Sequence, residues 1–344
     1  MRTTSKYRAA QMITAIGVVS LIAACSGNGG TAGGSATSTA SAGGYPDQNI
    51  TFVVPFSAGG PTDTVTRMIA EPMAAKLGGK IVVQNVEGAG GTVGAGQVAR
   101  AQPDGYTVLM HHIGMSTAPA LYKSLGYKPL ESFEMVGLVT EVPMTIVARK
   151  DFQPATLQDL VTYVKANANK VTLANAGIGA ASHLCGLLFQ TAAGVKLQEV
   201  PYEGTGPALT DLVGGQVDFM CDQTTNTSGQ ITAGEVKAYA VTTPERVKSL
   251  PDVPTTTEAG LPKLQVSVWH GLYVPVGTPK EVVQKLSEAL KVALADQKVI
   301  DQMAKLGTAP VPPESATPEA HRAKLQEQLG TWAKVIADAG VKAS

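Results

Sequence analysis

Residues that bind metal ions are scarce in this chain. Its 344 residues include three cysteines and five histidines, and no two cysteines form a Cys-x-x-Cys pair. Metal centres in proteins need several such ligands at close spacing. The sequence therefore predicts no metal site and no cofactor.

Two of the cysteines, Cys185 and Cys221, stand in apolar segments. Cysteine in such surroundings usually behaves as a small buried apolar residue. We expect two buried free thiols. A disulfide between them is the alternative if the chain folds in an oxidising compartment.

Long apolar runs and basic stripes are also missing. After residue 24 no run of 18 apolar residues occurs, so the rest of the chain is not expected to cross a membrane itself. Without residues 1–24 the chain has 24 basic against 27 acidic residues, a net charge of −3. Basic residues interleaved with aromatic ones are absent, so nucleic acid is not expected as a partner. We also expect a monomer.

The first 24 residues have the pattern of a secretory signal peptide. Arg2, Lys6 and Arg8 precede an apolar run over 12–24 that is too short to span a bilayer. The run ends in Leu-Ile-Ala-Ala-Cys at 21–25, which resembles a bacterial lipoprotein processing box. The resemblance implies cleavage before Cys25 and acylation of its sulfur. Ordinary cleavage after the alanines at 23–24 is the alternative.

Residues 26–44 consist almost entirely of Gly, Ser, Ala and Thr. Such a segment has little to bury, and we expect a disordered tether with an r.m.s. reach of about 25 Å. The predicted organisation is a signal peptide over 1–24, a lipidated cysteine and linker over 25–44, and a globular part from residue 45. We expect the protein in the periplasm, attached to a membrane only through Cys25.

Strand and helix patterns alternate through the globular part, which predicts an α/β fold with a mainly parallel sheet and helices on both faces. Ligands of such folds bind outside the carboxyl ends of the strands. The predicted strands are 50–54, 80–85, 107–112, 145–148, 171–174, 198–200, 217–220 and 238–241. The predicted helices are 64–77, 92–101, 157–167, 181–193, 208–213, 280–295, 297–306 and 318–339.

Three glycine-rich turns lead from a predicted strand into a predicted helix. They are Phe-Ser-Ala-Gly-Gly-Pro-Thr-Asp at 56–63, Asn-Ala-Gly-Ile-Gly-Ala-Ala-Ser-His at 175–183 and Pro-Tyr-Glu-Gly-Thr-Gly-Pro at 201–207. Glycine lets the backbone approach another molecule closely, and the first amides of a helix favour an anion. Thr62 or Asp63 is expected to cap the first helix. Together the turns predict a shared site for a carboxylate or phosphate.

Two segments are expected to connect two lobes: 140–143 and 267–275. The predicted lobes are 45–142 together with 271–344, and 143–270. The helices after residue 278 are expected to pack back on the first lobe.

Seven short motifs are spread over the globular part of the chain. They are VVPFSAGGPTD at 53–63, EGAGGTVG at 87–94, PDGYT at 103–107, VPYEG at 200–204, PALTDL at 207–212, GGQVD at 214–218 and PVGTP at 275–279. These motifs resemble those of the substrate-binding proteins of the tripartite tricarboxylate transporter system, the Bug or TctC family. The resemblance implies a two-lobe periplasmic-binding-protein fold of type II, with a hinge and a central cleft, and a small carboxylate delivered to integral-membrane transporter subunits. It implies no enzymatic activity.

The predicted ligand site combines the glycine turns with polar residues near other strand ends. No arginine lies within the turns, so we expect backbone amides and hydroxyls to hold the carboxylate, and neither Arg67 nor Arg149. The predicted ligand-binding residues are Phe56, Ser57, Ala58, Gly59, Gly60, Thr62, Asp63, His112, Gly114, Ala176, Gly177, Ile178, Gly179, Ser182, His183, Tyr202, Gly204, Thr205, Asp222, Gln223 and Trp269.

Two of these residues have a structural alternative. His183 either donates to the ligand or is satisfied by nearby backbone. Trp269 either lines the cleft or packs the hinge. The sequence does not identify the acid, which could be a dicarboxylate, a tricarboxylate or an aromatic acid.

Three other functions are compatible with parts of the sequence. The glycine run at 88–96 suggests a nucleotide, but it lacks the Lys-Ser/Thr of a P-loop and the spacing of a dinucleotide fingerprint. Ser116 follows a strand in a near match to a nucleophile elbow, so a serine esterase is an alternative. A carboxylate sensor that presents its ligand to a signalling receptor is another.

The lipoprotein hypothesis predicts that the wild-type protein partitions with membranes. Cys25→Ser should release the protein or leave it unprocessed, because acylation needs the thiol. Membrane fractionation and mass spectrometry of the N-terminus measure this. An unmodified N-terminus and a wholly soluble wild-type protein would contradict the anchor.

Overall fold

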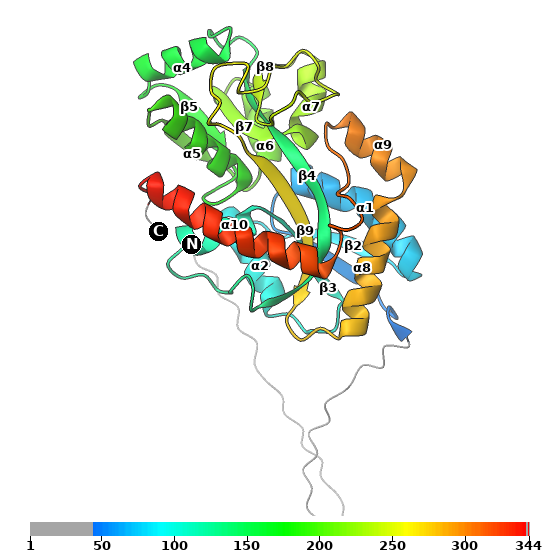
Figure 1. Ribbon diagram of the computed structural model, residues 1–344. Helices are drawn as coiled ribbons and strands as arrows, with labels where there is room; N and C mark the ends of the chain where they lie inside the picture. The colour runs from blue at the N-terminus through cyan, green and yellow to red at the C-terminus, as the bar shows by residue number, and fades with distance from the viewer. Residues whose placement is uncertain (1–43, 342, 344) are drawn as a thin grey trace, which may run out of the picture. The chain divides into compact units, whose positions relative to one another are not determined.

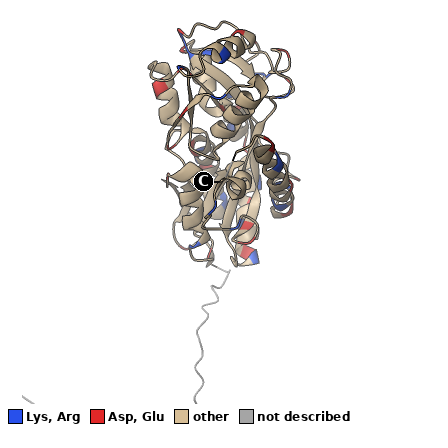
Figure 2. Ribbon diagram, turned by 90° about the vertical axis from the view of Figure 1, so that its left-hand side faces the viewer, with Lys and Arg blue, Asp and Glu red and all other residues tan. Residues whose placement is uncertain are grey.

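The computed structural model describes residues 44–341 and 343 (Figure 1). The signal segment, Cys25 and nearly all of the 25–44 linker lie outside these residues. No helix in the described part of the chain is long and apolar enough to span a membrane. Basic and acidic residues are interspersed over the ribbon in the view of Figure 2.

The described residues form nine strands that belong to one sheet and the helices that cover it. The strands are β1 (Ile50–Val54), β2 (Ile81–Asn85), β3 (Thr107–His112), β4 (Phe133–Arg149), β5 (Thr172–Asn175), β6 (Gln198–Pro201), β7 (Phe219–Gln223), β8 (Val236–Val241) and β9 (Ser267–Pro275). The helices are α1 (Pro61–Leu77), η2 (Ala89–Gly91), α2 (Thr92–Ala99), α3 (Gly114–Leu121), α4 (Leu157–Ala166), α5 (Ala181–Ala193), α6 (Thr205–Val213), α7 (Thr224–Thr232), α8 (Lys280–Leu294), α9 (Gln297–Lys305) and α10 (Pro318–Asp338).

The long strand β4 divides the sheet into two halves. In the first sheet half, β2, β1 and β3 are parallel, and β9 joins them to the N-terminal part of β4 by antiparallel pairing. In the second sheet half, the C-terminal part of β4 pairs antiparallel with β7 and β8, and β7, β5 and β6 are parallel. The expectation of a mainly parallel sheet thus holds at the two outer parts, while the centre is antiparallel.

The two predicted connecting segments lie side by side. Residues 140–143 of β4 pair with 267–270 of β9, with Thr140 opposite His270 and Pro143 opposite Ser267. β9 was not predicted as a strand, because its run of buried residues lacks polar–apolar alternation. The connection is therefore one two-stranded ladder, visible through the middle of Figure 1.

Both faces of the first sheet half are buried, as the alternation of side chains along its strands requires. Phe52 and Met110 belong to a core that includes residues of α1 and α8. Val53 and Leu109, their neighbours in sequence, belong to another core that includes residues of α2, α3 and α10. The helices thus hold the carboxyl ends of β1 and β3 in fixed positions.

Two short helices, α3 and α7, were not predicted from the sequence. Both follow a strand almost immediately, and α7 is rich in Thr, Ser and Asn, which have low helix propensity and no apolar period. α7 packs against β4, β7, β8 and α1, so tertiary contacts decide its conformation.

The expectation of two free thiols is wrong, because Cys185 of α5 and Cys221 of β7 form a disulfide. Their Cα atoms are 5.9 Å apart, within the range that a disulfide requires. Both side chains are buried, as expected. Sequence spacing could not decide the pairing, since the two residues come together only when α5 covers β7.

Reduction of this disulfide should destabilise the protein. The bond joins residues 36 positions apart, and the loop-closure entropy that it removes from the unfolded chain corresponds to about 3–4 kcal/mol. Urea denaturation with and without reductant measures the change in midpoint. The double variant Cys185→Ala/Cys221→Ala is the control and should not respond to reductant. Equal midpoints for oxidised and reduced wild type would contradict the pairing.

Candidate functional site

The turn from β1 into α1 presents free helix amides toward the second sheet half. α1 begins at Pro61 with Gly60 as its N-cap, and no side chain caps it. The expected capping by Thr62 or Asp63 is therefore wrong, since both lie within the first turn. By contrast, Thr156, Asp296 and Thr317 cap α4, α9 and α10 with their side chains.

The carboxylate of Asp63 shapes this turn. Its Oδ2 accepts a hydrogen bond from the Gly59 amide at 2.9 Å and one from Arg67 at 2.8 Å, and Asn85 donates to its Oδ1 at 3.0 Å. Burial raises the pKa of the Asp63 carboxyl, but the hydrogen bonds from Arg67, the Gly59 amide and Asn85 outweigh burial and lower it below its ordinary value. The carboxylate is thus ionised and fully engaged.

The N-terminus of α6 faces that of α1. Gly204 is the N-cap of α6, also without a side-chain cap, and the Ser57 amide donates to the Glu203 carbonyl at 3.3 Å. A Cβ atom built on Gly206 would lie 3.5 Å from the Gly60 amide nitrogen. Each helix N-terminus carries roughly half a positive charge. Two like ends therefore meet at this point of the fold.

The turn from β5 into α5 satisfies most of its own amides. Asn175 Oδ1 accepts from the Gly177 amide at 2.9 Å, and Ser182 Oγ accepts from the Ala176 amide at 2.8 Å. His183 Nδ1 accepts from the Gly179 amide at 3.2 Å. These three side chains hold the loop in shape.

The Nδ1 atom of His183 is satisfied by nearby backbone, the contact that the structural alternative expects. The Nε2 atom of the same ring lies 3.7 Å from Glu199 Oε2. Burial lowers the pKa of His183 below its ordinary value, and the nearby Glu199 partly offsets this.

The β5–α5 turn contacts elements of the first sheet half. Thr117 of α3 donates to the Gly179 carbonyl at 3.0 Å, and Tyr122 donates to the Ile178 carbonyl at 2.8 Å. Phe56 packs with Ala176 and Ala180. The loops predicted as one site are therefore brought together.

The glycine run at 88–96 also lies at this contact. Gly90 has a φ of +61°, and a Cβ there would collide with the Ile178 carbonyl oxygen. Glycine is needed for this close approach of backbones. This part of the run thus forms a backbone contact between the two sheet halves.

A buried imidazole cluster lies behind the α1 turn. His112 stacks on Phe56 with ring centroids 4.5 Å apart, and its Nδ1 accepts from the Gly114 amide at 2.9 Å. His270 Nε2 lies 3.3 Å from Thr62 Oγ1. Burial lowers the pKa of His111 to about 4, that of His270 to about 3, and that of His112 well below its ordinary value. These rings are neutral near pH 7.

The carboxyl end of β7 brings buried polar atoms to the same junction. Asp222 Oδ2 accepts from Asn226 Nδ2 at 2.5 Å, and Asn226 also donates to the Thr205 carbonyl of α6 at 3.2 Å. Four buried side-chain atoms here have no hydrogen-bond partner: Ser57 Oγ, Asp222 Oδ1, Gln223 Oε1 and Thr225 Oγ1. Buried polar atoms in proteins are nearly always paired. Unpartnered buried atoms also occur elsewhere, for example at Tyr127 and Tyr273, so it is their combination with the two uncapped helix N-termini that marks this junction as the candidate ligand site.

A groove opens at the surface between the β1–α1 turn and α6. It has a volume of about 510 Å³. It is lined by the exposed residues Ala58 and Gly59 on one side and by α6 on the other, and Asn226 and Gln230 also line it.

The side chains of three further predicted residues are engaged with other partners or exposed. Tyr202 donates to Asp211 Oδ2 at 2.7 Å on α6. Trp269 packs against His321 of α10, with ring centroids 5.9 Å apart, on the face of β9 opposite to His270. This is the hinge-packing alternative. Ile178 is 41% exposed.

The buried position of Ser116 argues against the esterase alternative. The residue lies inside α3, is 1% exposed, and its Oγ donates to the Ile113 carbonyl at 2.6 Å. A nucleophile elbow would present this hydroxyl at the surface of the site.

Sequence reasoning missed Thr117, Tyr122 and His270 as residues of this junction. The first two act through contacts between the sheet halves, which no local pattern reveals. His270 follows Trp269 in a strand that was taken for a connecting segment. The described residues contain no group of three or more His, Cys, Asp and Glu side chains that could hold a metal ion.

The family model described as tripartite tricarboxylate transporter family receptor matches residues 65–341. The solved structure of the periplasmic binding protein BugD is 55% identical with a TM-score of 0.86, covering 87% of this chain and 100% of that chain.

Two further solved structures contain a small acid. MatC from Rhodopseudomonas palustris with bound malate is 43% identical with a TM-score of 0.83, covering 85% of this chain and 100% of that one. Rpa4515 from R. palustris with adipate is 30% identical with a TM-score of 0.83, covering 87% and 100%. These likenesses confirm the expected periplasmic-binding-protein fold.

The buried carboxyl of Asp222 predicts a pH dependence of stability. Burial raises its pKa to about 7, although hydrogen bonds from Asn226, the Gln223 amide and Thr205 act in the opposite direction. The unfolded carboxyl has a pKa near 3.9. The folded state therefore binds the proton more tightly, and this group's contribution to stability is lost as pH rises from about 4 through 7.

Asp222→Asn isolates this effect from that of the buried histidines, whose lowered pKa values act with the opposite sign. The unfolding free energy of wild type minus that of the variant should fall by on the order of 3 kcal/mol between pH 4 and pH 8. Urea denaturation at several pH values measures it. A constant difference would contradict the assignment.

Proposed function

Because the chain belongs to the tripartite tricarboxylate transporter receptor family, we propose that it captures a small carboxylate between two lobes and delivers it to the membrane subunits of such a transporter. The family is one of transporter receptors, so the chain is a binding protein and not an enzyme, as the sequence predicted.

The main support for carboxylate binding is that two uncapped helix N-termini, those of α1 and α6, meet from opposite sheet halves. Without an anion, the positive ends of α1 and α6 repel each other across a short distance. The unpartnered hydroxyl of Ser57, 7% exposed, lies against Gly204 at this point. A carboxylate would accept from the hydroxyl and the amides and remove the repulsion.

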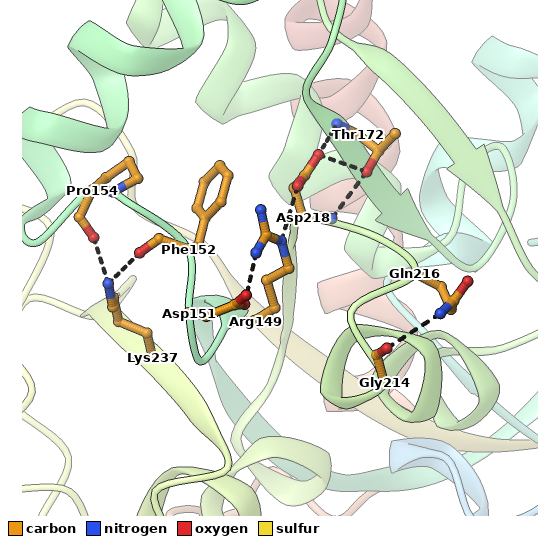
Figure 3. A network of polar contacts seen from close by, with 9 residues as sticks. All are labelled: Arg149, Asp151, Phe152, Pro154, Thr172, Gly214, Gln216, Asp218 and Lys237. Atoms are coloured by element: carbon orange, nitrogen blue, oxygen red, sulfur yellow. Dashed lines mark hydrogen bonds and ion pairs between the residues drawn. The ribbon is translucent and has the colours of Figure 1, made fainter.

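We do not propose that an arginine binds the ligand carboxylate. Arg67 is paired with Asp63, and Arg149 is paired with Asp151 and Asp218 (Figure 3). Both guanidinium groups therefore already have carboxylate partners within the protein. Amides and hydroxyls remain for the ligand.

The proposed lobes are 45–142 with 271–344, and 143–270, joined by the β4–β9 ladder. Residues on both sides of the site would approach by hinge motion of this ladder. The contacts of Thr117 and Tyr122 with the β5–α5 turn would form in the closed state. The closed protein would dock on the transporter.

The ligands of two related structures favour dicarboxylates as the first class to test. Malate and adipate, bound by MatC and Rpa4515, are both dicarboxylic acids of different length. We propose a periplasmic location from the likeness to BugD. Attachment through an acylated Cys25 is proposed from the sequence alone.

A thermal-shift panel of small acids tests the function. A ligand at 100 times its Kd should stabilise the protein by about 2.7 kcal/mol, which for a chain of this size is roughly 5 °C. Replacing the carboxylate by a neutral amide should weaken binding at least tenfold, because the helix termini and charge-assisted hydrogen bonds then lose their partner. No shift with any acid would contradict the proposal.

Gly204→Ala tests the mechanism. A Cβ at this position would collide with the Ser57 side chain, so binding of the best acid should weaken more than tenfold in calorimetry. Gly229→Ala in α7, where a Cβ meets nothing within 4 Å, is the matched control. Arg67→Ala should have less effect than Gly204→Ala. The reverse order would refute the helix-terminus mechanism.

A further inference from the structure

The buried imidazole of His183 ties the shape of the β5–α5 turn to a protonation state. The side chain is 7% exposed, and its Nδ1 accepts a hydrogen bond from the Gly179 amide at 3.2 Å. We propose that His183 is an acid-sensitive latch, whose protonation loosens this turn, opens the junction of the sheet halves and releases the ligand. The proposal rests on the proposed function and adds a regulation of the same site.

The hydrogen bond from Gly179 requires a neutral ring. A ring nitrogen that accepts carries no proton, so the proton of the neutral ring is on Nε2, which lies 3.7 Å from Glu199 Oε2. An imidazolium has a proton on both nitrogens and offers no acceptor in any orientation of the ring. Protonation of His183 therefore leaves the Gly179 amide without this acceptor.

The same turn makes contacts that join the two sheet halves. The Gly179 carbonyl accepts from the Thr117 hydroxyl of α3 at 3.0 Å, and the Ile178 carbonyl accepts from the Tyr122 hydroxyl at 2.8 Å. Gly179 thus uses its amide for the bond to His183 and its carbonyl for the contact across the junction. A shift of this residue disturbs both.

The cost of protonation falls mainly on the closed state. Gly179 and the His183 ring are both buried at the junction. A buried amide without an acceptor is costly, whereas an exposed amide can bond to water. When the halves separate by hinge motion, water can reach the turn and replace the lost acceptor. Protonation therefore shifts the equilibrium toward the open state, which holds the ligand less tightly.

The charged and titratable groups near the ring come from several elements. Among the described residues, Glu199 of β6 is the charged group at ion-pair distance. Burial lowers the pKa of His183 below its ordinary value, and Glu199 partly offsets this. Tyr122 keeps its proton, because burial and the nearby Glu203 raise its pKa.

Three further titratable groups lie on the strands behind the turn. His111 and His112 of β3 contact Gly114, which lies against the Gly179 carbonyl, and burial keeps both rings neutral by lowering their pKa. Asp222 ends the strand that α5 covers, and burial raises its pKa to about 7. Because Asp222 titrates near neutral pH, substitution of His183 is needed to assign a pH dependence of binding.

The sign of the effect follows from the lower pKa of His183 in the closed state. With an open-state ring near the ordinary value of about 6.5, ligand affinity is full above about pH 7 and falls as the pH drops below about 6.5. The largest loss that one such group can cause between pH 7.5 and pH 5.5 is about tenfold.

Calorimetry on the full chain with malate, succinate and adipate tests the latch. For the acid that binds most tightly, the ratio of Kd at pH 5.5 to Kd at pH 7.5 should be at least threefold larger for wild type than for His183→Asn. Asparagine does not titrate, and its Oδ1 can still accept from the Gly179 amide. Equal ratios in the two proteins would overturn the proposal.

Glu199→Gln covers the case in which His183→Asn does not fold. Without this carboxylate the pKa of His183 falls in both states, so the pH at which affinity is lost should move down by about 0.5 or more. Glu203→Gln is the matched control, because it makes the same change of charge at an exposed residue of the neighbouring turn, and it should keep the wild-type midpoint. An unchanged midpoint in Glu199→Gln would count against the latch.

The pKa of His183 itself gives a reading that a merely structural role would not move. Saturating ligand should lower this pKa, measured by NMR of the imidazole protons, because the coupling of ligand and proton is reciprocal. A pKa raised by the ligand would overturn the latch and show that the ring binds the acid as a cation. Failure of all three acids to bind at either pH would instead refute the proposed function for this class of acid, and the latch with it.

Discussion

Repulsion between two positive helix N-termini is the main electrostatic constraint at the junction of the two sheet halves. The uncapped N-termini of α1 and α6 point at each other from opposite halves, and glycines at 60, 204 and 206 let their backbones approach. Like partial charges at this distance are unfavourable without an anion. The contacts around them, from Phe56 packing to the hydrogen bonds of Thr117 and Tyr122, hold the halves together at this point. An anion bound between the two helix ends would remove this repulsion.

Most of the outer architecture could be predicted from the sequence, because it follows local rules. β1, β3 and α5 begin and end at the predicted residues, since apolar runs and glycine turns mark them clearly. The centre could not be predicted. β9 and the first part of β4 are buried on both faces and lack alternation, and α7 gains its helical form from packing.

The candidate site was predicted in outline but not in its chemistry. The glycine turns converge as expected, yet Asp63, Ser182 and His183 use their polar atoms on the loops themselves. Which polar groups are already paired is a property of the fold and not of the residue types. The disulfide of Cys185 and Cys221 illustrates the same limit, because its partners meet only through the packing of a helix on a strand.

The β4–β9 ladder also constrains how relatives of this chain can diverge. Trp269 and His270 stand next to each other and face opposite sides of the sheet. Inserting a single residue before them, with the pairing otherwise kept, would exchange the two faces and place an indole where the imidazole meets Thr62. A change of length in this part of the ribbon therefore needs a bulge to restore the register, and the ladder already contains register shifts nearer the start of β4.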